Sequence, residues 1–163
     1  MKHTISVLVE NEFGVLSRIS GLFSGRGFNI ESLSVAPTVD ADLSRMTLVT
    51  RGDDKVLEQI TKQLNKLIST IKVVDFTAGD YIERELALIK VTTDADSRAE
   101  ALRIVDIFRA KVIDVTPKSY TIEITGAPAK INGILELLRP MGIKEIVRSG
   151  PVVIGRGAKG VVG

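Results

Sequence analysis

The chain has 163 residues, 44% of them hydrophobic, which is enough to form the buried core of one domain or of two small ones. Its net charge of +2 comes from acidic and basic residues mixed along the sequence, which argues against a nucleic-acid or anionic membrane partner. The absence of cysteine excludes disulfides, thiolate nucleophiles and cysteine-ligated zinc. The N-terminus lacks the pattern of a signal peptide and no apolar run approaches membrane-spanning length, so we expect a soluble, cytoplasmic protein.

The first half of the chain is predicted to follow the order strand, helix, strand, strand, helix, strand. Residues 3–9 alternate between apolar and polar side chains, as in a half-buried strand. The helix that begins near Val15 is expected to end at Gly25 and Gly27, which suit a left-handed C-terminal cap. The remaining predicted elements are strands over 29–37, 43–51 and 71–76, and an amphipathic helix that starts at Asp53 and Asp54.

The second half is predicted to repeat that order. A strand over 85–92 precedes a helix that starts after Asp94 and Asp96, where carboxylates suit a helix N-terminus. Pro128 fits the first turn of the next helix, because its missing N–H would have no partner there in any case. The apolar residues of the first of these helices are Ala99, Leu102, Val105 and Phe108, and the other strands are predicted over 111–116, 120–125 and 143–148.

Each half therefore has the βαββαβ order of a ferredoxin-like unit, and the predicted fold class is α+β with two such units in tandem. We predict a first domain over residues 1–77, a linker over 78–83, and a second domain over 84–163 with a flexible tail from about residue 155. Residues 155–160 match the dinucleotide pattern G-x-G-x-x-G. Because only three residues follow the pattern, the helix and the distant acid that such a site needs are missing, and no dinucleotide site is expected.

The sequence offers little for catalysis. His3, the single histidine, lies at the exposed-looking start of the first predicted strand, so a solvated or structural role is expected. The carboxylates are scattered at helix starts, where capping explains them. A ferredoxin-like RNA-binding domain stacks bases on aromatic residues of its central strands, and the strand over 43–51 has none. We therefore expect no catalytic residue, no metal site and no nucleic-acid partner.

The segment from Glu10 to Leu16 is the strongest candidate for a binding site. It joins a buried strand to a helix whose first N–H groups, around Val15 and Leu16, lack intrahelical partners and carry the positive end of the helix dipole. Gly14 lets a ligand approach the backbone closely, and Asn11 can both donate and accept hydrogen bonds. These features suit the carboxylate of a small molecule, although an ordinary strand-to-helix turn explains the same residues equally well.

Residues 3–77 resemble an ACT domain, a regulatory module that binds small molecules through a D-x-x-G-x-L-type loop after its first strand. Longer blocks resemble, more specifically, the small regulatory subunit of acetolactate synthase. Phe13 departs from the proline common at its position, which is expected to loosen the loop slightly without removing the site. The matching blocks lie at 10–18, 21–23, 26–33, 43–47, 108–110, 113–116 and 148–150.

The resemblance implies that this chain has no active site or cofactor of its own. It implies a large catalytic subunit that holds thiamine diphosphate, FAD and magnesium, forms acetolactate from pyruvate, and becomes both more active and sensitive to valine when this chain binds. It also implies a homodimer paired around residues 29–37, with valine between the two chains. The effector-binding residues carried over at matching positions are Asn11, Gly14, Val15, Leu16, Asn29 and Ile30.

The alternative hypothesis is a stand-alone, dimeric ACT-domain sensor that binds an amino acid and acts on another partner. Both hypotheses describe a protein that binds a small molecule and performs no chemistry on it. Co-purification with a large, thiamine-dependent subunit would distinguish them.

Overall fold

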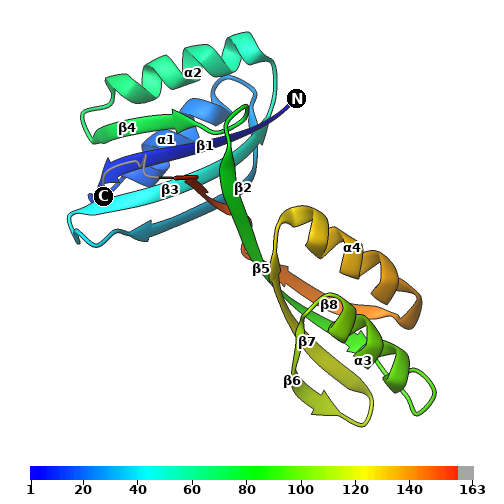
Figure 1. Cartoon of the computed structure of the whole chain (residues 1–163). Coiled ribbons are helices and arrows are strands. Elements are labelled where there is room, and N and C mark those ends of the chain that lie inside the picture. Colours follow the sequence, from blue (N-terminus) through cyan, green and yellow to red (C-terminus); the bar gives the residue numbers. More distant parts are fainter. Residues whose placement is uncertain (158–163) are drawn as a thin grey trace. The chain divides into compact units, whose positions relative to one another are not determined.

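The computed structural model describes residues 1–157, and in it the chain divides into two compact units. The first unit comprises Met1–Ile82 together with the segment that begins at Val152, and the second comprises Glu83–Pro151. Each unit contains an antiparallel sheet with two helices on one of its faces (Figure 1). The predicted α+β class, with two ferredoxin-like units in tandem, is thus confirmed. Within residues 1–157 no helix is both long enough and apolar enough to cross a membrane.

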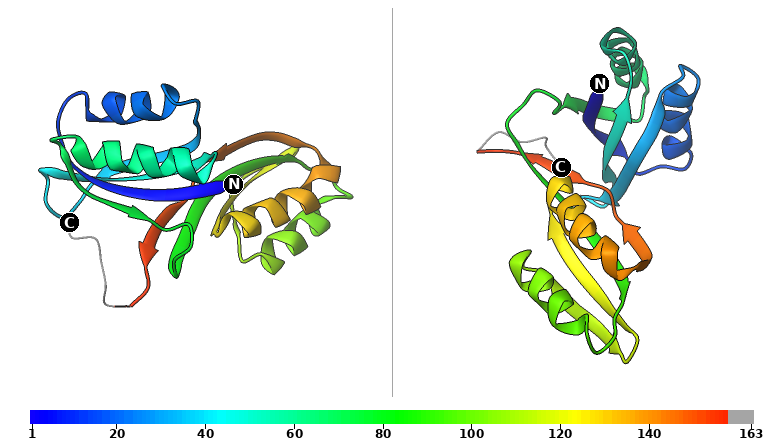
Figure 2. Two further views of the ribbon diagram at one scale, coloured as in Figure 1. Left: turned by 90° about the horizontal axis from the view of Figure 1, so that it is seen from above. Right: turned by 90° about the vertical axis from the view of Figure 1, so that its right-hand side faces the viewer.

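Four strands and two helices form the βαββαβ part of the first unit. They are β1 (Lys2–Glu10), α1 (Val15–Ser24), β2 (Asn29–Pro37), β3 (Leu43–Arg51), α2 (Asp54–Lys66) and β4 (Thr70–Asp75). The strand order is β2-β3-β1-β4, and both helices cover the same face of the sheet (Figure 2). Because the side chains of β1 alternate, Ile5, Val7 and Val9 face these helices and form the core with residues such as Ile19 and Leu64.

The register of this sheet defines its two ends. Along β3, Arg51 lies opposite both Lys2 of β1 and Asn29 of β2. At the other end of the sheet, Glu10 of β1 lies opposite Leu43 of β3, and Pro37 of β2 lies opposite Ser44. The loop that follows β1 therefore lies at the Pro37 end of β2, away from Asn29. We call this the loop end of the first unit.

The opposite face of this sheet is also covered, so β1 is buried on both sides. Ser6 is fully buried, and its Oγ accepts a hydrogen bond of 3.0 Å from Nε of Arg45. The Nη2 atom of Arg45 donates to the carbonyl oxygen of Val153 at 2.8 Å, in the short strand β9 (Val152–Gly155). Burial lowers the pKa of Arg45 from its ordinary value. The end of the described chain thus belongs to the core of the first unit.

The second unit has the strand order β6-β7-β5-β8 and its own core between the sheet and two helices. A buried carboxylate, Glu85, receives two hydrogen bonds from Arg148, Nε to Oε1 at 2.6 Å and Nη2 to Oε2 at 3.0 Å. These bonds and the charge of Glu85 raise the pKa of Arg148. The elements are β5 (Tyr81–Thr92), α3 (Arg98–Ile107), β6 (Lys111–Thr116), β7 (Ser119–Gly126), α4 (Pro128–Leu138), the 3-10 helix η1 (Arg139–Met141) and β8 (Ile143–Arg148).

The structure corrects three expectations about the ends of elements. The strand predicted from residue 85 begins at Tyr81, so half of the predicted linker over 78–83 is strand. The segment 152–155 is β9 and belongs with the first unit, whereas it was predicted to lie in the second domain.

Most of the predicted tail, 158–163, lies outside the described residues, as does the second half of the G-x-G-x-x-G pattern. Gly25 has ordinary helical angles, and only Gly27 adopts the left-handed conformation.

Two expectations about which side chains are exposed were also wrong. His3 is only 3% exposed, and its Nε2 lies 3.1 Å from Oδ1 of Asp54 and 3.3 Å from the carbonyl oxygen of Gly52. The start of α2 folds over the first strand, which its local sequence does not indicate. In α3 the buried face includes Ala101 and Ile104 in addition to Val105, whereas Leu102 is 44% exposed, because the helix is rotated relative to the predicted stripe.

Candidate functional site

The loop between β1 and α1 is held in place by the two neighbouring loops. The N–H of Glu10 donates to the carbonyl oxygen of Ser69 at 2.7 Å, and the N–H of Asn11 donates to that of Asp42 at 2.8 Å. The side-chain Nδ2 of Asn11 donates to the carbonyl oxygen of Ala41 at 3.2 Å. Asn11 therefore already uses a donor within the chain, and its Oδ1 is the atom that remains available to an ammonium group among the described residues.

Gly14 begins α1 in the left-handed conformation, with φ 80° and ψ −5°. It provides no capping side chain, and the first turn of α1 contains no acidic residue. Within the described chain, no backbone carbonyl accepts a hydrogen bond from the N–H groups of Val15, Leu16 or Ser17. These donors and the positive end of the helix dipole together favour a carboxylate at this position.

The two apolar residues of the predicted site contribute in different ways. Val15 is only 4% exposed and packs into the core, so it offers a ligand its N–H group alone. Leu16 is 44% exposed and can contact an apolar ligand side chain. The space above Gly14 is open as well, since a Cβ added there meets nothing within 4 Å. A small molecule can therefore reach the backbone at this loop.

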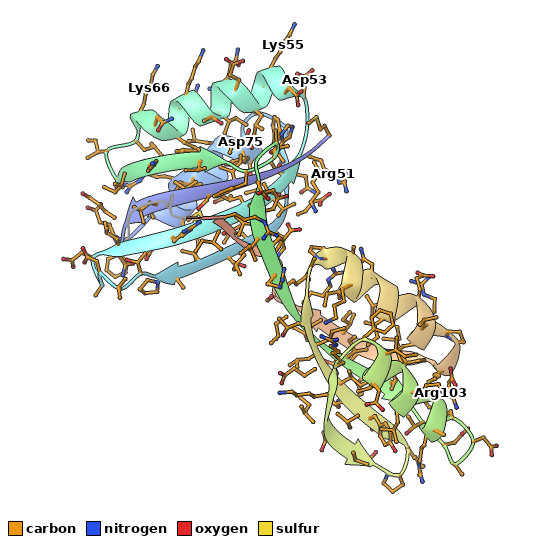
Figure 3. All side chains as sticks on the ribbon, in the orientation of Figure 1. Arg51, Asp53, Lys55, Lys66, Asp75 and Arg103 are labelled. Carbon is orange, nitrogen blue, oxygen red and sulfur yellow. The ribbon has the colours of Figure 1, made fainter. Side chains whose placement is uncertain are left out.

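Asn29 and Ile30 lie at the other end of the sheet from this loop. Asn29 is the first residue of β2, lies opposite Arg51 and is exposed, while Ile30 packs partly against the core. The nine residues of β2 span about 26 Å. Figure 3 labels Arg51 at this end of the unit and Lys66, which ends α2, at the loop end. One chain therefore does not bring the six predicted residues together.

The side chains of Glu12, Arg18 and Ser69 complete the loop, and the sequence analysis did not identify them as a group. The Oγ of Ser69 donates to Oε2 of Glu12 at 3.1 Å, and Nη2 of Arg18 donates to the same Oγ at 3.3 Å. A hydrogen bond with Glu12 and the charge of that residue raise the pKa of Glu10. The pairing of Ser69 with Glu12 depends on the fold and has no local sequence signal, although Glu12 and Arg18 both belong to the block at 10–18.

Comparisons with known proteins give matches to one family over nearly the whole chain. Residues 5–72 match the family model described as the AHAS small subunit-like ACT domain, and residues 84–157 match that of the small subunit of acetolactate synthase. The acetolactate synthase small subunit of Mycolicibacterium smegmatis is 54% identical over 98% of this chain and 94% of its own length. That of Aquifex aeolicus is 55% identical over 95% of this chain and 81% of its own length.

A solved structure gives the same result. The crystal structure of the acetolactate synthase small subunit from Thermotoga maritima superposes with a TM-score of 0.87 at 40% sequence identity, over 98% of this chain and 99% of that one. Sequence and three-dimensional structure thus agree across both units. The chain belongs to the family of acetolactate synthase small subunits.

Proposed function

We propose that this chain activates the large catalytic subunit of acetolactate synthase and makes it sensitive to inhibition by valine. In this proposal the thiamine diphosphate, FAD and magnesium belong to the large subunit, and the complex acts in the cytoplasm in branched-chain amino acid biosynthesis. Membership of the small-subunit family supports the existence of a large partner. The residues of the β1–α1 loop support an effector with a carboxylate.

The observation that carries the effector assignment is the uncapped start of α1. Three neighbouring N–H groups, the open space above Gly14 and the exposed side chain of Leu16 form a place for a molecule with a carboxylate and an apolar branch. The free Oδ1 of Asn11 suits the ammonium group of the same molecule. Valine has these three groups and fits the proposal.

The separation of the six predicted residues supports a dimer. In the described chain β2 is an edge strand, and an edge strand readily pairs with another strand. Antiparallel pairing of β2 with its copy about a two-fold axis near Leu33 places Asn29 of one chain beside Pro37 of the other. Because Pro37 lies at the loop end, Asn29 and Ile30 of one chain then approach the β1–α1 loop of the other. We propose that valine binds at this seam.

A valine bound at the seam can act on the large subunit only by preferring one state of the complex. It touches both copies in this proposal, so it favours the arrangement in which the β1–α1 loop of one copy and the start of β2 of the other lie close together. The activated and the inhibited complex would then differ in how tightly these segments are held. Both states retain the bound large subunit.

Reconstitution tests the proposed function. The full chain is mixed with its cognate large subunit, and acetolactate formation is measured with and without valine. We expect the activity of the large subunit to rise on addition of the chain and to fall again when valine is added. A chain that is folded and dimeric but neither binds nor activates the large subunit would favour the stand-alone sensor.

A further inference from the structure

Three large hydrophobic side chains of the first unit are almost wholly exposed. Phe13 is 104% exposed, Val39 101% and Ile68 95%. The next most exposed large hydrophobic residue in the described chain is Met1, at 70%. A single exposed apolar side chain is ordinary on a protein surface, but several in one place mark a surface that binds a partner.

These three residues lie together, because each belongs to one of the loops at the loop end of the first unit. Phe13 lies between β1 and α1, Val39 between β2 and β3, and Ile68 between α2 and β4. The N–H of Asn11 bonds to the second of these loops at Asp42, and the N–H of Glu10 bonds to the third at Ser69. We define the loop-end surface as residues 12–13, 38–42 and 67–69.

The rim of the loop-end surface carries an excess of negative charge. Glu10, Glu12, Asp40 and Asp42 lie in or beside its loops. The nearby cations include Arg18, whose Nη2 lies 3.9 Å from Oε2 of Glu12, Lys66, which projects from α2 away from the sheet (Figure 3), and the exposed Lys72 of β4, opposite Leu8; the four carboxylates outnumber these three. Pairing this surface with a second copy about a two-fold axis would bring like charges together. The charge therefore favours a different protein whose rim is basic.

We propose that the loop-end surface docks on the large subunit of acetolactate synthase, in an apolar recess bordered by lysine or arginine side chains. This inference rests on the proposed function, in which the chain binds that subunit, and it specifies the surface that binds. Phe13, Val39 and Ile68 enter the recess, and the carboxylates of the rim meet the basic border. A few side chains that become fully buried at the centre of an interface commonly contribute most of its binding energy.

The same loop connects docking to the proposed effector site. Phe13 of the loop-end surface directly precedes Gly14, and the N–H groups proposed to hold valine follow at once. A ligand at the start of α1 therefore restrains the loop that carries Phe13. Such a restraint changes how Phe13 packs against the large subunit. A bound effector can therefore change the contact with the large subunit directly through this loop.

The test uses the full chain and the purified cognate large subunit, without valine. The double variant Val39→Ser/Ile68→Ser changes the loop-end surface and leaves the six predicted effector residues intact. The matched control is Val115→Ser, at a residue of the second unit that is 62% exposed. We expect the double variant to bind the large subunit at least tenfold more weakly with an unchanged melting temperature, and the control to bind like the wild type. Val39→Leu/Ile68→Leu should retain binding.

The outcomes separate this inference from the proposed function. If the wild-type chain binds the large subunit and the serine variant binds equally well, the loop-end surface is not the docking surface, and the proposed function is unaffected. If the wild-type chain itself does not bind, the proposed function fails. A loss of self-association of the serine variant in light scattering, with unchanged affinity for the large subunit, would assign the surface to a second copy and overturn the inference.

Discussion

The two units share one strand order but differ in the turn that joins their first strand to the following helix. In the second unit, Oδ1 of Asp94 accepts hydrogen bonds from the N–H groups of Asp96 at 2.9 Å and Ser97 at 2.8 Å. The Oγ of Ser97 accepts from the N–H of Asp94 at 2.9 Å in return. In the first unit the turn contains no such carboxylate bond: the N-cap of α1 is Gly14, which provides no side chain, and it corresponds to Ser97, the N-cap of α3.

This difference shows two ways of holding the turn before the helix: the second unit uses a carboxylate of the turn itself, and the first unit uses hydrogen bonds from Glu10 and Asn11 to the two neighbouring loops. The second unit supplies its own carboxylate to the N–H groups that precede α3. The first unit leaves the N–H groups of α1 to a partner, and we propose that the carboxylate of valine is that partner.

The largest expected effect comes from giving the first unit a carboxylate of its own. Gly14→Asp places a negative charge where the carboxylate of valine is proposed to bind, so the two charges repel each other. We expect the variant to activate the large subunit but to require about 100-fold more valine for inhibition, which corresponds to about 2.7 kcal/mol of binding free energy. Acetolactate formation at increasing valine concentrations measures this change.

Gly14→Asn is the matched control for that substitution. Asparagine tolerates the left-handed conformation and is close to aspartate in size, and the added Cβ meets nothing within 4 Å. We expect a clearly smaller loss of valine sensitivity than with aspartate, because only the charge differs. Full valine sensitivity of Gly14→Asp would show that the effector binds elsewhere.

The second prediction concerns the internal pairing of the second unit. Arg148→Ala leaves the carboxylate of Glu85 buried without its cation, which is expected to cost about 2 kcal/mol, less than for a fully enclosed pair because the Arg148 side chain is 33% exposed. Lys90→Ala is the control, because its pair with Glu145 is exposed and 3.7 Å long, and its loss should cost less than about 0.5 kcal/mol. Urea unfolding with hydrogen exchange at β5 and β7 measures both. Equal effects of the two variants would contradict a special role for the buried pair.

The third prediction concerns the dependence of the first unit on a distant segment. Val153 is 5% exposed, so Val153→Ala removes two buried methyl groups and is expected to cost about 1.5 kcal/mol. Val152→Ala is the control on the same strand, since Val152 is 54% exposed. Hydrogen exchange should become faster at the amides of β1 and β3 and stay unchanged in β7. A change confined to β7 would contradict the assignment of this segment to the first unit.

The elements that follow a local pattern were predictable from the sequence. The apolar stripe of α2 reflects burial on one face, and the apolar residues at alternate positions of 3–9 mark the face of β1 that packs on the helices, although β1 is buried on its other face as well. Strand β9 has only four residues, and its contact with Arg45 spans more than half of the chain, so no local pattern indicates it. The burial of His3 likewise depends on α2, which lies some fifty residues further along the chain.

The candidate site was predictable only in part, for a related reason. Gly14 and the free N–H groups follow from a strand, a glycine and a helix in succession, and that order is visible in the sequence. Asn29 and Ile30 came from the family resemblance, and their separation from the loop became visible only with the register of β2. The exposure of Val39 and Ile68 could not be predicted, because an apolar residue in a loop is as compatible with the core as with a partner.

The last prediction, with the smallest expected effect, concerns the charge of Asp94 in the turn before α3. The hydrogen bonds from the N–H and Oγ of Ser97 are the main causes that lower the pKa of Asp94 from its ordinary value of 3.8. A carboxyl group whose pKa is lower in the folded state stabilises the fold above its unfolded pKa, and this contribution disappears as the pH falls through the folded pKa.

Asp94→Asn keeps an oxygen that accepts the same hydrogen bonds but removes the charge. We therefore expect the variant to melt slightly below the wild type at pH 7, and the difference to shrink as the pH falls below 3.8 until the two melting temperatures coincide. Because Asp94 is exposed to solvent, added salt should also reduce the difference at pH 7. A difference that is independent of pH would mean that the shape of the side chain, and not its charge, stabilises the turn before α3.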